Sequence, residues 1–328
     1  MAERDFGVLE QYGCKLYSVS RGRGAFICET NRGPVILREY SGRPEKLAAR
    51  AALLEYLTER GLKVDYYIRN LEGSYISTDA SGVDYTLCFW FHARECDIKS
   101  FSDVCVAIQS MARLHKLLEG YQNESEAEFQ IARSLREEYD KHNRELKMIR
   151  NYLSDKRRKS DFELLAAAKC QEFLSEGLEA ASVIRESGYD AAYQDAVSRR
   201  TLCHGDYNYH NVFVAEQQGC ICGFEQCSVN LRLTDLYNFM RKLMEKYDWD
   251  VKMGYLMLRE YDNIYHLSAE DVRLLGVMFS YPEKFWKILN YYFNANKAWI
   301  PNKNMEKLKL VVKQNRMRRE FVRTLYGA

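Results

Sequence analysis

The sequence predicts an α+β protein of two lobes, a small N-terminal lobe built on an antiparallel sheet and a larger lobe that is mostly helical. Before residue 95, short segments rich in β-branched, aromatic and other apolar residues alternate with Gly and Asn, which is typical of strands. After residue 100, apolar residues recur every three to four positions over long stretches, which is typical of helices. With 328 residues the chain is long enough for each lobe to bury a core. We therefore expect domains over residues 1–95 and 96–328.

Composition narrows the class of protein. Hydrophobic residues make up 47% of the chain and charged residues 29%, which is ordinary for a soluble globular protein. A net charge of +2 gives no electrostatic reason to expect a nucleic acid as partner. The start of the chain has no apolar core of signal-peptide length, and no later run approaches the ~20 apolar residues of a membrane span. We expect the ten cysteines to be reduced thiols of a protein made in the cytoplasm.

The small lobe begins with three expected strands, over residues 15–20, 25–30 and 35–40. The first connection contains Gly22 and Gly24, a composition that is often only turn chemistry in a hairpin. The third strand carries Arg38. A helix with one apolar stripe is expected over residues 45–60, ended by Gly61. Further strands are expected over residues 66–69, 74–78 and 84–91.

The larger lobe is expected to consist of amphipathic helices. Each of the expected segments carries an apolar stripe with polar residues on its other side. The expected ranges are 102–118, 125–153, 161–185, 234–246, 251–261, 268–279, 281–294 and a tail helix from residue 304.

The most informative stretch of the chain is residues 201–225. Strand patterns over residues 200–203 and 219–224 enclose a loop that reads His204-Gly205-Asp206-Tyr207-Asn208-Tyr209-His210-Asn211. An Asp followed five residues later by an Asn, on a loop, is the arrangement that phosphoryl transfer from a nucleotide requires. Asp206 would accept a proton from the attacking hydroxyl, and Asn211 would hold magnesium on the phosphates. The alternative is an Asx-rich turn in which both side chains only cap backbone groups.

The motif HGDxxxxN, from His204 to Asn211, resembles the catalytic loop of the aminoglycoside phosphotransferase and choline kinase superfamily, which has a protein kinase-like fold. The resemblance implies ATP and Mg²⁺ as cofactors of an active member. It also implies that Gly22 and Gly24 cover the phosphates. Arg38 stands where the family has a phosphate-gripping Lys, and this exchange is not conservative. A helix Glu pairs with that Lys in such folds, and Glu45 and Glu55 are both candidates here.

The chain departs from the family pattern at a second position. In the family the strand after the loop ends in Asp-Phe-Glu or Asp-Trp-Glu, and the Asp is the second metal ligand. This chain has Gly223-Phe224-Glu225, so the carboxylate is missing from its expected position. In an extended strand Glu225 would point to the same face as Gly223, two residues earlier, and we expect it to serve as a metal ligand instead.

Within the superfamily the chain resembles the CotS-type spore coat proteins of endospore-forming bacteria, nearly from end to end. The likeness rests on SRGRGAF with ILREY, HARECDI, CHGDYNYHN, DLYNFMRKLMEKYDWD and YPEKFWKILNYYFNANKAW. It implies a structural or assembly component of the spore coat, made during sporulation, with other coat proteins as partners and a degenerate, pseudokinase-like site. The alternative is an active ATP-dependent phosphotransferase acting on a small-molecule hydroxyl or a coat protein. Gly223 and Arg38 favour the first interpretation, because positions that hold metal and phosphate are altered.

Overall fold

The chain divides into two compact units. The computed structural model describes residues 6–22, 24–122, 128–294 and 302–326. By contacts, unit 1 comprises Met1–Gln130 with Leu202–Val229, and unit 2 comprises Ile131–Thr201 with Asn230–Ala328. This division differs from the predicted boundary after residue 95. The reason is that the segment around the HGDxxxxN loop pairs with the N-terminal part of the chain through a parallel strand contact.

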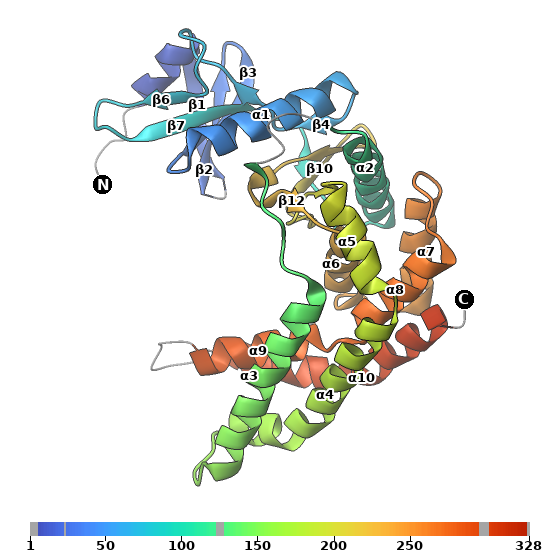
Figure 1. The fold of residues 1–328 in the computed structure, drawn as a ribbon. Helices are drawn as coiled ribbons and strands as arrows, with labels where there is room; N and C mark the ends of the chain where they lie inside the picture. Colours follow the sequence, from blue (N-terminus) through green and yellow to red (C-terminus); the bar gives the residue numbers. More distant parts are fainter. Residues whose placement is uncertain (1–5, 23, 123–127, 295–301, 327–328) are drawn as a thin grey trace. The chain divides into compact units, whose positions relative to one another are not determined.

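Unit 1 opens with an antiparallel sheet in the order β1-β2-β3-β7-β5, with β6 also paired to β7 (Figure 1). Its strands are β1 (Leu16–Gly22), β2 (Ala25–Thr30), β3 (Gly33–Glu39), β5 (Tyr67–Ile68), β6 (Ile76–Thr78) and β7 (Asp84–Phe89). Side chains alternate between the faces of a strand, so Val35 and Leu37 of β3 face the same side. That side packs against the 3-10 helix η1 (Gly7–Tyr12) in a buried cluster. Arg38 therefore faces the opposite side of the sheet.

Two helices and a smaller sheet complete this unit. Helix α1 (Pro44–Glu59) begins with Pro at its first turn, as the fixed φ of Pro favours, and matches the predicted helix. The smaller sheet has the order β4-β11-β10-β8 and is accompanied by the pair β12-β9. These elements are β4 (Lys63–Val64), β8 (Arg94–Glu95), α2 (Phe101–Glu119), β9 (Leu202–Cys203), β10 (Val212–Ala215), β11 (Gln218–Ile221) and β12 (Ser228–Val229). Helix α2 packs on β9, β10 and β11.

The predicted strand over residues 219–224 is too long. Strand β11 ends at Ile221, and Gly223 adopts a left-handed conformation with φ of 83°. Residues Phe224–Gln226 then form the 3-10 helix η3. The expectation that Glu225 lies two residues along an extended strand from Gly223 is therefore wrong, because the backbone turns at Gly223.

Unit 2 is helical. Its helices are α3 (Leu135–Asp155), α4 (Asp161–Glu186), α5 (Tyr189–Ser198), α6 (Leu233–Met244), α7 (Val251–Asp262), α8 (Ala269–Ser280), α9 (Glu283–Asn294) and α10 (Asn302–Tyr326). Helices α3 and α4 pack side by side (Figure 1). Helix α3 begins at Leu135, because the Ser134 side chain caps it by accepting a hydrogen bond from the backbone of Glu137. The predicted helix began at residue 125, and its residues 125–127 lie outside the described residues. Apolar residues of α3, α4, α9 and α10 share one buried core.

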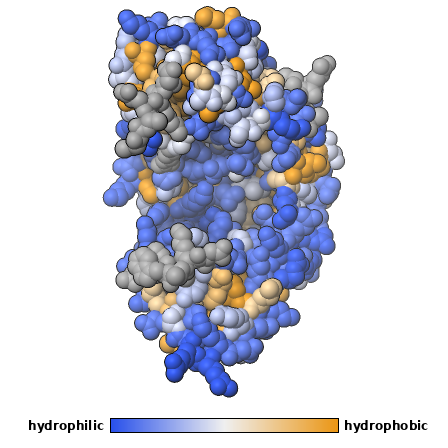
Figure 2. Space-filling view, turned by 90° about the vertical axis from the view of Figure 1, so that its left-hand side faces the viewer, coloured by the Kyte–Doolittle hydropathy of each residue, from blue (hydrophilic) through white to orange (hydrophobic). Residues whose placement is uncertain are grey.

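The predicted α+β class is confirmed, with antiparallel strands in the N-terminal part and helices in the C-terminal part. On the face drawn in Figure 2, hydrophobic side chains of the described residues form separate patches among hydrophilic ones. None of the described helices combines the length and the apolar character needed to cross a bilayer.

Candidate functional site

The loop that follows β9 is shaped by a glycine. Gly205 has φ of 80°, a conformation that L side chains rarely adopt. A Cβ atom built on Gly205 would lie 2.0 Å from the backbone oxygen of Gln226. Only glycine can bring these two backbone segments so close, so the second residue of the HGD motif is required by the geometry of the loop.

His204 braces the loop. Its ring is fully buried, and its Nδ1 accepts a hydrogen bond from the backbone N–H of Asp206 at 3.3 Å. The other ring nitrogen, Nε2, lies 3.1 Å from the backbone oxygen of Cys222. Because Nδ1 acts as an acceptor, Nε2 carries the proton and donates to that carbonyl. The imidazole thereby connects the loop to the residue that follows β11.

Asp206 and Asn211 lie together in the loop. The Asn211 amide nitrogen lies 3.0 Å from the backbone oxygen of Asp206 and 3.3 Å from its Oδ2. The Asn208 amide donates to the other carboxylate oxygen, Oδ1, at 3.1 Å. The Asp206 side chain is on an exposed residue. Two amides therefore orient a carboxylate that solvent or a ligand can reach. The same hydrogen bonds also satisfy the alternative of an Asx-rich turn.

Arg38 is held by carboxylates that the motif did not predict. Its Nη1 donates to Asp65 Oδ2 at 3.1 Å and lies 3.7 Å from Glu225 Oε1. Among the described residues, the helix candidates behave differently: Glu55 accepts a hydrogen bond from the Tyr75 hydroxyl at 2.6 Å, and Glu45 is exposed. The pairing that such folds make with a helix Glu is thus made here by Asp65, just after β4.

Asp65 could have been found from the sequence by one signal. It is a single carboxylate inside the apolar and aromatic run from Val64 to Ile68. A charged residue in a run that reads as buried needs a partner of opposite charge, since an isolated buried charge is very costly. The identity of that partner depends on the tertiary fold.

The buried surroundings of Asp65 disfavour the ionised form of its carboxyl group. It is 2% exposed, and burial raises its pKa to about 6 although the Arg38 guanidinium acts to lower it. Its Oδ2 also lies 3.4 Å from the backbone nitrogen of Gly223. Its Oδ1 is buried and has no hydrogen-bond partner in the part of the chain that the structure describes. For Arg38, burial acts to lower the pKa, but Asp65 and the neighbouring negative groups raise it above the ordinary value.

The glycines of the first hairpin lie where the sequence predicts. Gly22 ends β1 and pairs with Ala25 across the turn. Gly24 has φ of 67°, and a Cβ atom built on it would meet no atom of the described residues within 4 Å beyond its chain neighbours. The space beside Gly24 is therefore open, and the proposed contact of both glycines with phosphates stays a prediction.

The residues predicted to hold a metal supply oxygen donors, which Mg²⁺ prefers. No group of three or more His, Cys, Asp or Glu among the described residues could hold a metal ion. Mg²⁺ is usually bound by one or two protein ligands together with phosphate oxygens and waters, so the donor types of Asn211 and Glu225 suit an ion that arrives with a nucleotide. Their role as metal ligands stays a prediction. A Cβ atom on Gly223 would lie 3.1 Å from the Asn211 amide nitrogen. A carboxylate at position 223 would therefore begin beside Asn211.

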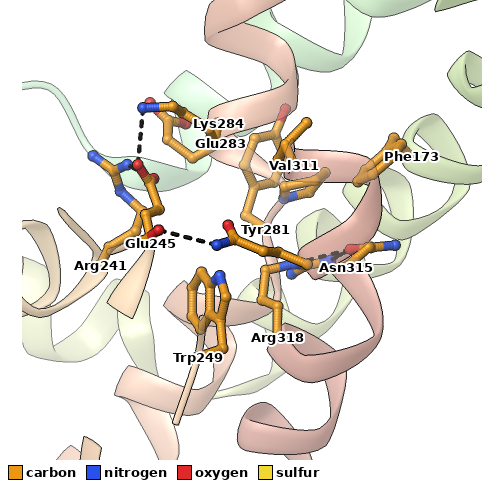
Figure 3. Close-up of a pocket in the computed structure, with 12 residues that line it drawn as sticks. Phe173, Arg241, Glu245, Trp249, Tyr281, Glu283, Lys284, Val311, Asn315 and Arg318 are labelled. Atoms are coloured by element: carbon orange, nitrogen blue, oxygen red, sulfur yellow. Dashed lines mark hydrogen bonds and ion pairs between the residues drawn. The ribbon is translucent and has the colours of Figure 1, made fainter. Parts of the chain in front are cut away.

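A pocket in unit 2 involves none of these residues (Figure 3). Glu245 receives Lys284 Nζ at 2.8 Å and Arg241 Nη1 at 2.5 Å, and Arg318 pairs with Glu176. Each cation that lines the pocket thus has an acidic partner, so the described lining of the pocket presents no unpaired positive charge for a ligand. The lining residues are Phe173, Arg241, Glu245, Trp249, Tyr281, Pro282, Glu283, Lys284, Val311, Gln314, Asn315 and Arg318.

Comparison with known proteins relates most of the chain to a phosphotransferase family. The model of the APH family, described as "Phosphotransferase enzyme family", matches residues 19–266. Spore coat protein S of Bacillus subtilis (strain 168) is 22% identical over 297 residues, covering 88% of this chain and 82% of that protein.

Solved structures share the fold. An aminoglycoside phosphotransferase from Alicyclobacillus acidocaldarius superposes with a TM-score of 0.86 at 15% identity, covering 100% of this chain and 96% of that one. Amicoumacin kinase in complex with AMP-PNP and Ca²⁺ gives a TM-score of 0.59 at 12% identity, covering 96% and 89% of the two chains. Spectinomycin phosphotransferase in complex with ADP gives 0.56 at 13% identity, covering 97% and 95%. At these identities the likeness to the solved structures establishes the fold alone.

Proposed function

Because the chain belongs to the phosphotransferase enzyme family, we propose that it is a kinase-like structural or assembly protein of the spore coat whose phosphotransferase site is degenerate. Its likeness to spore coat protein S, over 88% of the chain, supports the place in the coat. On this proposal the protein is made in the cytoplasm during sporulation, becomes part of the coat, and has other coat proteins as partners.

The observation that carries the proposal is the backbone at Gly223. The position that in the family holds a metal-binding carboxylate has no side chain and a φ of 83°. The carboxylates of Asp65 and Glu225, which flank this position in the fold, both pair with Arg38. Phosphoryl transfer depends on positive charge that stabilises the transition state at the transferring phosphate. On this proposal, the loss of a metal ligand removes part of that stabilisation and lowers the rate.

The proposal includes residual nucleotide binding. Gly22 and Gly24 would cover the phosphates of ATP, Arg38 would contact them, and Asn211 and Glu225 would hold Mg²⁺. The bound ion would supply positive charge against the phosphate oxygens. Relatives solved with AMP-PNP or ADP support this use of the fold. We expect a Kd in the high micromolar range or above, about 5–6 kcal/mol or less of binding free energy. Calorimetry without heat, together with no displacement of a fluorescent ATP analogue, would remove nucleotide binding from the proposal.

A second candidate is an active phosphotransferase that acts on a small-molecule hydroxyl or a coat protein. The contact between the Asn211 amide and Asp206 Oδ2 at 3.3 Å favours it, because the loop keeps both residues that transfer requires. In this candidate Asp206 accepts the proton of the acceptor hydroxyl. Removing a positioned base lowers a rate by about 10²–10⁴-fold while binding of the nucleotide is nearly unchanged.

One experiment with two measurements decides between the candidates. The first is ATP consumption and phosphate transfer by the purified protein and its Asp206→Asn variant. The second is incorporation of that variant into the coat of sporulating cells. Normal incorporation without turnover by the wild-type protein is the expected result. Robust wild-type turnover that Asp206→Asn abolishes would overturn the structural proposal and establish the phosphotransferase.

A further inference from the structure

The side chains around Arg38 differ in how firmly they are held. We propose that Arg38 is a gated site for a phosphate-bearing anion, in which Asp65 fixes the guanidinium and Glu225 covers it until the anion takes its place. The inference deepens the nucleotide binding proposed above and rests on it. In the absence of a ligand, Glu225 pairs with Arg38, a contact that its proposed role as a metal ligand does not predict.

Asp65 is the fixed partner. Its carboxylate is 2% exposed and accepts the Arg38 Nη1 hydrogen bond at 3.1 Å. The same oxygen lies 3.4 Å from the backbone nitrogen of Gly223, which connects it to a second segment. A buried carboxylate that lost Arg38 would be left as an unpaired charge, so this pair is expected to stay together when a ligand binds.

Glu225 is the exchangeable partner. Its side chain is 46% exposed, and its Oε1 lies 3.7 Å from Arg38 Nη1, beyond normal hydrogen-bond distance. Its backbone is held separately, because the Glu225 carbonyl oxygen accepts from Arg50 Nη2 at 3.4 Å. The side chain can therefore swing away while η3 keeps its place. An exposed ion pair of this kind contributes about 1 kcal/mol or less, so the cost of opening is small.

Charge explains why the gate opposes an anion. Arg38 carries one positive charge and faces two carboxylates, those of Asp65 and Glu225. A phosphate that approaches Arg38 meets the Glu225 carboxylate on the accessible side, since Asp65 is buried. When Mg²⁺ accompanies the phosphate, Glu225 gains a cation of higher charge as an alternative partner. Part of the benefit of Mg²⁺ for ATP binding should therefore come from drawing Glu225 away from Arg38.

The test uses the full-length protein and ATP as the probe. Dissociation constants are measured by calorimetry, first with EDTA and then with Mg²⁺, for the wild-type protein and Glu225→Gln. We expect Glu225→Gln to bind metal-free ATP about three- to tenfold more tightly than the wild type, the effect of losing an exposed competing ion pair. Mg²⁺ should improve binding by the wild type more than binding by the variant. Glu45→Gln is the matched control, because it removes the same charge from an exposed position of α1.

The outcomes separate the gate from the nucleotide binding beneath it. Tighter metal-free binding by Glu225→Gln and not by Glu45→Gln supports the gate. If the wild type binds ATP and Glu225→Gln binds metal-free ATP with the same or a lower affinity, the gate is overturned and nucleotide binding stays in place. An equal gain in both variants also overturns it, because net charge then explains the effect. No binding by any of the proteins, with or without Mg²⁺, overturns both proposals.

Discussion

The Asp65 carboxylate and the Arg38 guanidinium form a largely buried ion pair, with 3.1 Å between Asp65 Oδ2 and Arg38 Nη1. The pair joins β3 to the segment after β4, and through the backbone of Gly223 to the turn that precedes η3. In this pair Asp65 takes the part that a helix Glu plays in kinase-like folds. The Asp65 Oδ1 is buried with no hydrogen-bond partner among the described residues. Burial raises the pKa of this carboxyl group, so the stability of the fold depends on pH.

Asp65→Asn should change how stability depends on pH. Burial raises the pKa of Asp65 from 3.8 to about 6 in the folded protein, so the folded state binds the proton more tightly than the unfolded state. The resulting stabilisation is fully present below about pH 4 and is lost as the pH rises through 6. The free energy of unfolding of the wild type should therefore fall, relative to that of Asp65→Asn, by roughly 2–3 kcal/mol between pH 4 and pH 7.

Urea unfolding at several pH values measures this difference directly. Working with the difference between the two proteins cancels the other titrating groups. Asp84→Asn, at a partly exposed position of β7, serves as the control for loss of an Asp charge in unit 1. If the difference in free energy of unfolding between wild type and Asp65→Asn is constant across this pH range, the pKa of Asp65 is not raised in the folded protein.

Gly205→Ala should destabilise unit 1 far more than Gly24→Ala. Both glycines have positive φ, 80° and 67°, but only at Gly205 does a Cβ meet backbone, 2.0 Å from the Gln226 oxygen. We expect a loss of at least about 3 kcal/mol for Gly205→Ala, from strain and steric overlap together. Gly24→Ala has open space and should lose about 1 kcal/mol, the cost of the left-handed backbone alone. Thermal unfolding compares the two, and equal losses would mean that the loop moves to relieve the overlap.

Local patterns predict most of the elements but not those that depend on distant pairing. The helix expected over residues 161–185 appears as Asp161–Glu186, because its apolar stripe and its Ser160 capping box are both local. Strands β4 and β8 have two residues each and exist only because β11 and β10 pair with them. No periodicity can indicate a strand of two residues. The packing of the HGDxxxxN segment with the N-terminal part of the chain was missed for the same reason.

The candidate site shows the same limit. Asp206, Asn211 and His204 are close in sequence, so their spacing predicts their contacts. Asp65 reaches Arg38 from 27 positions away, and nothing local selects it over Glu55. The turn at Gly223 replaces the expected strand because glycine permits a left-handed backbone, an option that a strand pattern does not reveal.

Glu283→Gln should destabilise the helical unit more at neutral than at acidic pH. This pH dependence is opposite in direction to the one expected from Asp65. Burial acts to raise the pKa of Glu283, but His142, Lys287 and Arg241 together lower it to about 2. A lowered pKa gives stability that is present above about pH 4.5 and lost as the pH falls through 2. We expect Glu283→Gln to lower the free energy of unfolding by roughly 3 kcal/mol at pH 7 and by less at pH 3. Glu186→Gln, at an exposed position of α4, is the control in urea unfolding, and similar losses for both variants would contradict the prediction.

Gly223→Asp tests whether the missing carboxylate is what limits the site. Asp tolerates a left-handed backbone better than most residues, so the variant should fold. Its Cβ would press on the Asn211 amide at 3.1 Å, and its charge would lie near Asp65 and Glu225. We expect a loss of stability of about 1–2 kcal/mol from this crowding and from like-charge repulsion.

The same variant should gain magnesium-dependent ATP binding. The new carboxylate would begin beside Asn211, and two oxygen ligands that converge on one ion bind it more tightly than Asn211 alone. We expect the ratio of ATP affinities with and without Mg²⁺ to rise by about tenfold, which corresponds to 1.4 kcal/mol. Gly223→Asn has a side chain of the same shape and a similar tolerance of the backbone but no charge, so it separates the ligand from the crowding. If both variants fold and show the same magnesium dependence as the wild type, the absent carboxylate is not the defect. Under the proposal of a degenerate site, the pairing of Asp65 and Glu225 with Arg38 would then be the remaining difference to test.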